Sequence, residues 1–348
     1  MRYWLGVRNL HHNWMSGDLA RVDCRLMLPV SMEDVVAAAK RIRGQAVRTP
    51  LLRLPVDGEV YAKCENLQRT GSFKFRGAFN AVAALLERGE QLRGVVADSS
   101  GNHAQGVAAA AHLLGVKSCI VIPRNAPAIK VQRTAAWGAE IVRCPDASSE
   151  RMALAMQIRD ERGWAYIAPF DNADVIAGQG TAGLEICEDL RDVQTVLVCV
   201  GGGGLLAGIV TAVKALAPNA RVIGVEPELA ADAQESFRTG KRVSWDASLV
   251  TRTVCDGVRT QGIGALNFQI IRALVDDMVT VSEAAIISAM RFYALEAKLA
   301  VEPTGALTLA ALQSGAVAGM GKTVCLISGG NFDPVFYGAV IAGNSSSQ

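Results

Sequence analysis

Histidine is scarce in this chain of 348 residues: only four occur, and two of them, His11 and His12, stand near the N-terminus. A Ser-His-Asp triad or a zinc site built on histidines therefore has almost nothing to draw on. The eight cysteines lack CxxC spacing, and several lie inside apolar runs, as expected for buried thiols of a cytoplasmic protein. No run of about 18 apolar residues occurs, so we expect no transmembrane span.

Neither sign of charge is in excess, since 35 Lys and Arg stand against 33 Asp and Glu without a long charged run. This balance is unlike that of a nucleic-acid-binding surface. Half of the residues are hydrophobic, which argues against a disordered chain, and the length allows a two-domain α/β enzyme with a large core. We therefore expect a small-molecule substrate, with no nucleic-acid or membrane partner.

The first 26 residues show no clear hydrophobic periodicity and lack the continuous apolar core of a signal peptide. The interpretable fold begins near Met27, with a helix capped at Ser31. We expect residues 1–26 to be a disordered extension outside the catalytic fold, and residues 344–348 to be a polar tail.

Short β-rich runs alternate with helical patterns between residues 94 and 162. A second series begins at Thr195 and continues to Val225, and a further strand is expected at 323–327. Alternation at this spacing predicts parallel sheets with crossover helices.

Lys74 lies between Phe73 and Phe75, with small residues at 71–72 and 77–78. A desolvated lysine has a lowered pKa and can attack a carbonyl, which makes it a natural Schiff-base residue. The alternative is an amphipathic segment whose lysine reaches solvent.

Four consecutive glycines, Gly201, Gly202, Gly203 and Gly204, follow an apolar run and precede a helical pattern. Backbone N–H groups at such a turn can converge on a phosphate, although a plain strand-to-helix turn has the same pattern. Neither the Walker pattern nor the spaced dinucleotide fingerprint is present, which favours a phosphate-bearing cofactor other than ATP or NAD.

A lysine nucleophile, a phosphate-binding turn and a polar loop at 98–106 together describe a pyridoxal 5'-phosphate (PLP) site. The chain resembles the fold-type II PLP enzymes, which are tryptophan synthase β-like, and among them the serine/threonine dehydratase (threonine deaminase) and serine racemase family. The matching motifs occur in the family's order, at residues 72–78, 99–103, 176–181, 201–204, 224–227, 302–304 and 328–331.

The resemblance implies an α/β fold of two domains, with parallel sheets flanked by helices. A small domain, 90–171, would be inserted into a large PLP-binding domain formed by 27–89 and 172–343, with the cofactor in the cleft between them. The chain stops soon after Asn331, so we expect no C-terminal regulatory domain. The family is mostly dimeric, which implies a homodimer.

The resemblance also implies residue roles. Lys74 would hold the cofactor and then act as the base at the substrate Cα, Phe73 would pack near the ring, and Asn102 would bind the 3'-oxygen. The remaining cofactor-binding residues are Gly201, Gly202, Gly203, Gly204, Gly257, Glu302 and Ser328. Ser328 would meet the pyridine nitrogen, where a neutral hydroxyl weakens the electron sink and favours loss of a β-hydroxyl; it could also cap a helix.

The substrate carboxylate would be held by Ser99, Ser100, Gly101, Asn102 and His103. Ser100 leaves two activities open, because racemases place a serine there as a proton donor opposite the lysine, whereas typical threonine dehydratases have alanine. The segment 169–171 is more similar to the dehydratases. We therefore predict an ammonia-lyase acting on L-threonine or L-serine; the alternatives are serine racemase, alone or with dehydratase activity, and 3-hydroxyaspartate dehydratase.

A metal site is implied by similarity to the racemase branch. Glu226, the carbonyl of Ala230, and Asp232 would bind Mg²⁺ or Ca²⁺. The alternative is an acidic helix start favoured by the helix dipole.

Overall fold

The computed structural model describes residues 28–99, 101–124, 126, 128–145, 148–318 and 321–343. The expectations for residues 1–26 and 344–348 and the structural side of those for Ser100 lie outside the described residues. The first helix, α1 (Met32–Arg41), begins as the sequence predicts: Asp34 N–H donates to Ser31 Oγ, and Ser31 N–H donates to the Asp34 carboxylate.

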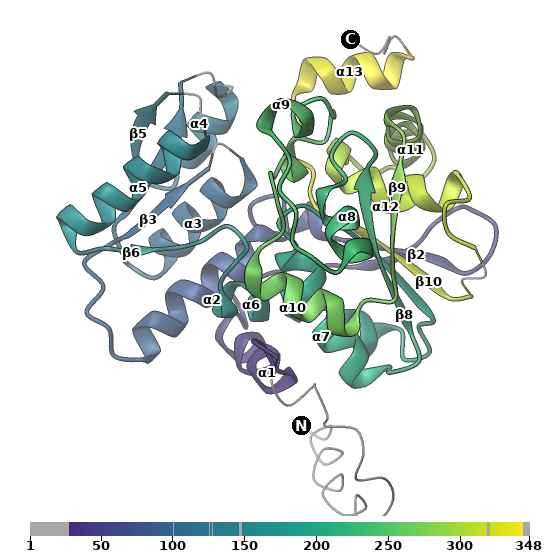
Figure 1. Ribbon diagram of the computed structural model, residues 1–348, viewed down its shortest axis with the longest axis horizontal. Coiled ribbons are helices and arrows are strands. Elements are labelled where there is room, and N and C mark those ends of the chain that lie inside the picture. Colours follow the sequence, from purple (N-terminus) through teal and green to yellow (C-terminus); the bar gives the residue numbers. More distant parts are fainter. Residues whose placement is uncertain are drawn as a thin grey trace, which may run out of the picture.

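The larger of two sheets takes its six strands from both ends of the chain (Figure 1). Only β1 is antiparallel to its neighbour. In spatial order the strands are β1 (Leu51–Arg53), β2 (Val60–Cys64), β10 (Thr323–Ile327), β7 (Thr195–Cys199), β8 (Arg221–Pro227) and β9 (Asp277–Val281).

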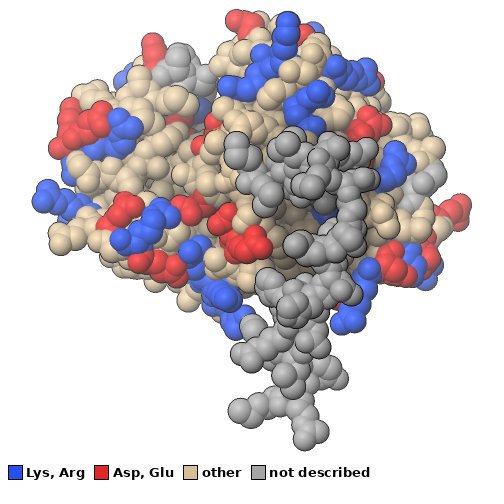
Figure 2. Space-filling model, turned by 60° about the horizontal axis from the view of Figure 1, so that its bottom comes forward, with Lys and Arg blue, Asp and Glu red and all other residues tan. Residues whose placement is uncertain are grey.

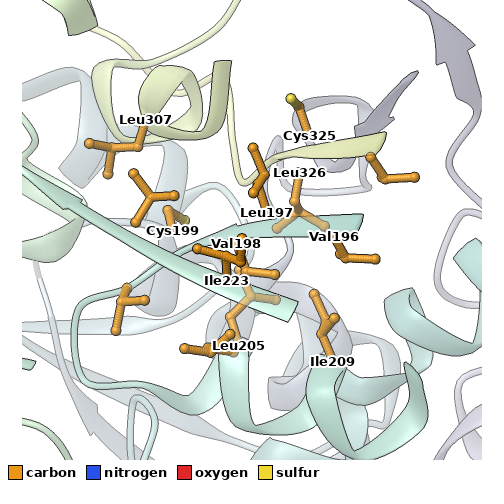
Figure 3. Packing of buried hydrophobic residues seen from close by; sticks show 14 of the residues in the cluster. Val196, Leu197, Val198, Cys199, Leu205, Ile209, Ile223, Leu307, Cys325 and Leu326 are labelled. Atoms are coloured by element: carbon orange, nitrogen blue, oxygen red, sulfur yellow. The ribbon is translucent and has the colours of Figure 1, made fainter. Parts of the chain in front are cut away.

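Helices cover both faces of this sheet, which explains why β7 and β10 are apolar at nearly every position. Figure 3 shows Leu307 of α12 (Pro303–Gln313) on one side of the strands, and Leu205 and Ile209 of α7 (Gly204–Leu216) on the other. The site residues that follow β7 and β10 are therefore carried by strands that are buried at every position.

The smaller sheet has four parallel strands, and its side chains alternate between two helical layers. Val95 and Ala97 pack in the cluster that contains α3 residues, whereas Val96 packs with α5 residues. The strands are, in spatial order, β5 (Glu140–Cys144), β4 (Ser118–Pro123), β3 (Val95–Asp98) and β6 (Ala165–Tyr166). The helices of this unit are α3 (Asn102–Leu113), α4 (Ala128–Ala135) and α5 (Ser148–Arg162).

The sequence prediction of an α/β fold with parallel sheets flanked by helices is confirmed. Glycines join the helices at the centre: a Cβ on Gly178 of α6 (Ala173–Asp189) would lie 2.6 Å from the Cα of Gly77 in α2 (Lys74–Glu87). A Cβ on Gly180 would lie 2.8 Å from the Gly208 carbonyl of α7. The motif at 176–181 therefore brings three helices together.

The remaining helices flank the larger sheet or border its edge. They are α8 (Asp232–Thr239), α9 (Ala247–Val250), α10 (Ala265–Leu274), α11 (Glu283–Leu295) and α13 (Pro334–Ala342), with short 3-10 turns η2 (Glu65–Leu67) and η3 (Asp256–Val258). On the face shown in Figure 2, Lys and Arg side chains are interspersed with Asp and Glu. In the described ranges, every helix is too short or too polar to cross a bilayer.

Candidate active site

The candidate site lies where strands of both sheets end. Lys74 begins α2, and the residue before it, Phe73, donates its backbone N–H to the Ser328 carbonyl at 3.0 Å, just beyond β10. The glycine run follows β7, and Ser99 follows β3. The carboxyl ends of parallel strands are the usual place for a ligand in an α/β fold.

Lys74 is partly buried, and its Nζ donates to the Pro169 carbonyl at 2.6 Å. The amine also lies 5.2 Å from the centroid of the Phe73 ring. Burial lowers the pKa of Lys74 to about 8. A much larger fraction of the amine is therefore uncharged near neutral pH than in an unshifted lysine, as a nucleophile or base requires.

His103 is buried in α3 close to Lys74. Burial and the charge of Lys74 lower the pKa of His103 to about 3, so the ring is neutral at physiological pH. Because Nε2 lies 2.8 Å from the Ile167 carbonyl, this nitrogen must carry the proton and donate. His103 therefore orients the start of α3 and is no candidate for a general base.

Ser99 and Gly101 form the described part of the polar loop. The Gly101 N–H donates to Ser99 Oγ at 3.1 Å, and Gly101 precedes the first residue of α3. Asn102, the first residue of that helix, donates to Glu302 Oε1 and accepts from Asn331 Nδ2, both at 2.8 Å.

Glu302 is a buried carboxyl whose pKa is raised to about 7 by burial and by Asp256. It accepts from the Asn331 backbone N–H at 3.2 Å as well as from Asn102. The sequence motif at 328–331 does not single out Asn331, but the structure places its amide between Asn102 and the Thr70 carbonyl. The two asparagines and Glu302 thus fix one another.

The glycine run is a tight turn that has no room for side chains. Gly203 has φ +90°, and a Cβ on Gly202 would lie 2.3 Å from the Phe170 ring. The Gly202 carbonyl accepts from Asn267 Nδ2 at 2.7 Å and from the Gly264 N–H at 3.0 Å. Within the described part of the chain, the backbone N–H groups of all four glycines remain without a partner, so they can bind an anion.

Gly257 borders the same turn from the other side. Its N–H donates to Thr304 Oγ1 at 3.2 Å, and the next residue, Val258, contacts Gly201: a Cβ on Gly201 would lie 3.0 Å from Val258 Cα. A side chain at Gly257 would also collide with Thr304, at 2.9 Å.

Ser328 is buried, and its Oγ has no oxygen or nitrogen partner in the described residues; the polar group beside it is the Cys199 thiol, a weak hydrogen-bonding group. The alternative that Ser328 caps a helix is wrong, because α13 begins at Pro334 and is capped by Asp333. A buried hydroxyl without a partner indicates that a further polar atom belongs at this position. The site thus offers a lysine amine, an anion-binding turn and an unpartnered hydroxyl, which fit the three polar features of PLP.

The suggested metal ligands lie at the start of α8, away from Lys74 along the sheet edge. Glu226 accepts from the N–H groups of Ala233 and Gln234, at 3.2 and 2.7 Å, as an acidic helix start would. Both Asp232 oxygens, however, are buried without a partner in the described residues, which a helix cap does not explain. Burial raises the pKa of both carboxyls, that of Asp232 to about 7.

In the described residues, the buried carboxyl groups of Glu226 and Asp232 have no Lys or Arg side chain beside them. Together with the Ala230 carbonyl, their oxygens are the kind of ligand that a hard metal cation prefers. Among the described residues, no group of three His, Cys, Asp or Glu side chains is arranged to hold a metal ion. The site would therefore depend on backbone oxygen and water.

Several residues that shape the site were not assigned to it from the sequence: Pro169, Phe170, Asp171, Asn267, Thr304 and Asn331. Asp171 accepts from the Ala265 and Leu266 N–H groups, each at 2.9 Å, and so holds the start of α10. The segment 169–171 and the motifs at 302–304 and 328–331 were noted as similarities, so those residues had a signal. Asn267 had none.

Comparison with known proteins places these motifs in context. The family described as "Pyridoxal-phosphate dependent enzyme" matches residues 42–329. An L-threo-3-hydroxyaspartate ammonia-lyase from Pseudomonas sp is 43% identical over 319 residues, which are 90% of this chain and 99% of that protein.

Two solved structures are similar over nearly their full length. The T.th. threonine deaminase has a TM-score of 0.82 and 46% sequence identity, covering 87% of this chain and 99% of its own. A maize serine racemase has a TM-score of 0.84 and 34% identity, covering 90% and 98%.

Proposed function

Because this chain belongs to the pyridoxal-phosphate dependent enzyme family, we propose that it is a PLP-dependent ammonia-lyase that converts L-threonine or L-serine to a 2-oxo acid and ammonia. The observation that carries the proposal is the meeting of Lys74, the unpartnered Ser328 hydroxyl and the anion-binding glycine turn at the ends of β7 and β10. The relatives then favour elimination over other reactions of PLP.

PLP, when bound, supplies the electron sink that stabilises negative charge at the substrate Cα. The N–H groups of Gly201–Gly204 would bind its phosphate, the Ser328 hydroxyl would meet its pyridine nitrogen, and the Asn102 amide, fixed by Glu302, would meet its 3'-oxygen. Phe73 and Gly257 border the same space.

Lys74 is the residue that moves the proton. An amine with a pKa of about 8 can accept the Cα proton near neutral pH, and the Pro169 carbonyl holds Nζ in place. The substrate carboxylate is bound by Ser99, Ser100, Gly101, Asn102 and His103. Since the single ring N–H of neutral His103 already donates to the Ile167 carbonyl, His103 would contribute its backbone N–H and add no charge.

Serine racemase is the second candidate. It is favoured by the Ser-Ser-Gly-Asn-His loop at 99–103 and by similarity to the maize enzyme. In that reaction Ser100 would return a proton to Cα from the face opposite Lys74. The Pseudomonas relative makes L-threo-3-hydroxyaspartate a third substrate to test.

The test is product analysis of the holoenzyme with L-threonine, L-serine and L-threo-3-hydroxyaspartate in parallel, in which 2-oxo acid and the enantiomers of the amino acid are measured together. Elimination predicts 2-oxo acid and ammonia in equal amounts. D-Serine formed from L-serine without 2-oxo acid would show a racemase. Neither product from any of the three would refute both candidates.

A divalent cation, Mg²⁺ or Ca²⁺, is proposed at Glu226, Ala230 and Asp232. Support comes from the two unpartnered oxygens of Asp232. Because the site lies at the start of α8, its role is to stabilise the fold next to the cleft.

Three further points are proposed. The residues 90–171 form a small domain inserted into a large one, 27–89 with 172–343; the four-stranded sheet lies wholly within the first interval. The protein is a homodimer, as the family implies. It works in the cytoplasm, where the seven described cysteines, all of them buried, would stay reduced.

A further inference from the structure

One buried carboxylate next to the substrate loop has no part in the mechanism above. Asp98 is the last residue of β3 and directly precedes Ser99. It is only 4% exposed. A carboxylate at this depth is stable in its charged form only if it is paired and hydrogen-bonded.

Two elements supply the partners of Asp98. Arg151 of α5 donates from Nε to Oδ2 at 3.1 Å, and Tyr166 of β6 donates its hydroxyl to Oδ1 at 2.5 Å. Burial and the Asp98 charge raise the pKa of the Tyr166 hydroxyl, which keeps it protonated as a donor. Charge-assisted hydrogen bonds to Asp98 therefore connect the end of β3 with α5 and with β6.

The same stretch of β6 also reaches the other side of the substrate loop. The residue after Tyr166 is Ile167, whose carbonyl accepts from His103 Nε2 at 2.8 Å. Two residues later, the Pro169 carbonyl accepts from Lys74. Residues 166–169 thus contact Asp98, which precedes the loop, His103 at the end of the loop, and Lys74.

We propose that Asp98 is a positioning residue for substrate binding: through Tyr166 and Arg151 it fixes the direction in which Ser99 and Gly101 leave β3 and so presents their donors to the substrate carboxylate. The inference rests on the proposed function, because it takes these residues as the carboxylate-binding loop. Asp98 itself touches neither substrate nor cofactor.

A positioning role predicts that mutation of Asp98 changes KM much more than kcat. Asp98→Asn keeps the shape of the side chain and one oxygen acceptor, but it removes the charge that holds Arg151. We expect KM for L-threonine or L-serine to rise by at least about tenfold, in line with the loss of one charge-assisted hydrogen bond. We expect kcat to change much less, because the backbone of Lys74 is anchored at the start of α2 by the bond from Phe73 to Ser328, outside this network.

A matched control is an ion pair between another strand of the smaller sheet and the same helix, α5. Glu140 of β5 pairs with Arg162 of α5 at 2.5 and 2.9 Å, on the exposed side of the unit and away from the loop. Glu140→Gln removes a comparable ion pair between a strand and α5, and it should leave both KM and kcat within about twofold of wild type.

Binding is measured separately from turnover by titrating each holoenzyme with L-alanine, which has no β-leaving group, and following the cofactor's visible absorbance. Asp98→Asn should weaken L-alanine binding in parallel with KM. If wild type binds L-alanine but eliminates no β-hydroxy amino acid, the proposed function fails while the inference can still be decided.

Tyr166→Phe provides a second variant if Asp98→Asn does not fold, since it removes only the hydroxyl that reaches Asp98. It should shift KM in the same direction by a smaller factor. If either variant folds and matches wild type in KM and in L-alanine affinity, or loses only kcat, the positioning role is overturned. A lower melting temperature with unchanged KM would show that Asp98 is purely structural.

Discussion

Replacing Gly202 by alanine tests the phosphate-binding turn most directly. An added Cβ would lie 2.3 Å from two ring atoms of Phe170, where ordinary van der Waals contact needs at least 3.4 Å. The ring or the turn must therefore move by about 1 Å. Overpacking of this kind costs about 1–3 kcal/mol in a well-packed site.

This free-energy cost should appear either in the stability of the apoenzyme or in its affinity for PLP. If the turn keeps its shape, the strain lowers the free energy of unfolding of the apoenzyme by about 1–3 kcal/mol. If the turn gives way, its N–H groups no longer converge, and PLP affinity falls by about 5–150-fold for the same free energy. Denaturant unfolding of the apoenzyme and PLP titration of the same preparation measure the two parts.

Gly338 of α13 offers a matched control, because a Cβ there would meet no atom within 4 Å. Gly338→Ala should leave PLP affinity unchanged and raise stability by about 0.5–1 kcal/mol, as expected for glycine replaced inside a helix. If Gly202→Ala resembled this control in both measurements, the turn would not be the rigid anion site described above.

Four further predictions concern Lys74, the proposed metal site and Ser100. Lys74→Ala should abolish product formation while leaving the melting temperature of the apoenzyme within a few degrees of wild type; repeated turnover by this variant would exclude Lys74 as the proton-transferring residue. Attachment of PLP to the apoenzyme should become faster as the pH rises and level off above about pH 8. The reason is that only the unprotonated amine reacts, and burial lowers the pKa of Lys74 to about 8. A midpoint near 10.5 would contradict the burial argument. EDTA should lower the melting temperature of wild type, with recovery on adding Ca²⁺ or Mg²⁺, whereas Asp232→Asn should not respond to either, since the buried carboxylate needs the cation. Ser100→Ala should remove any D-serine formation and leave much of the 2-oxo acid formation; an equal fall in both would indicate a role in binding alone.

Local parts of this fold were predictable from the sequence because their causes are local. The helix start at Ser31 depends on a side chain three residues away, and the strand Thr195–Cys199 is marked by its own apolar run. The tight turn at Gly203 needs a positive φ, for which consecutive glycines are a direct signal.

Contacts between distant segments carried no such signal. Lys74 and the Pro169 carbonyl are 95 residues apart, and Asn102 and Glu302 are 200 apart. The motif at 176–181 was recognised from the sequence, but its glycines turned out to serve helix packing against Gly77 and Gly208. Only the folded arrangement separates a residue that meets a ligand from one that lets two helices approach.

Burial, more than pairing of opposite charges, sets the electrostatics of the site. It lowers the pKa of Lys74 to about 8 and that of His103 to about 3, and it raises the pKa of Glu302 to about 7. Each shift favours the uncharged form of its group, so these three side chains carry less charge near neutral pH than they would in water. The backbone N–H groups that are proposed to bind the anionic groups of cofactor and substrate cannot take a proton from Cα. Lys74, with a pKa of about 8, can both accept that proton and release it, whereas the Glu302 carboxyl is held by Asn102 and Asn331.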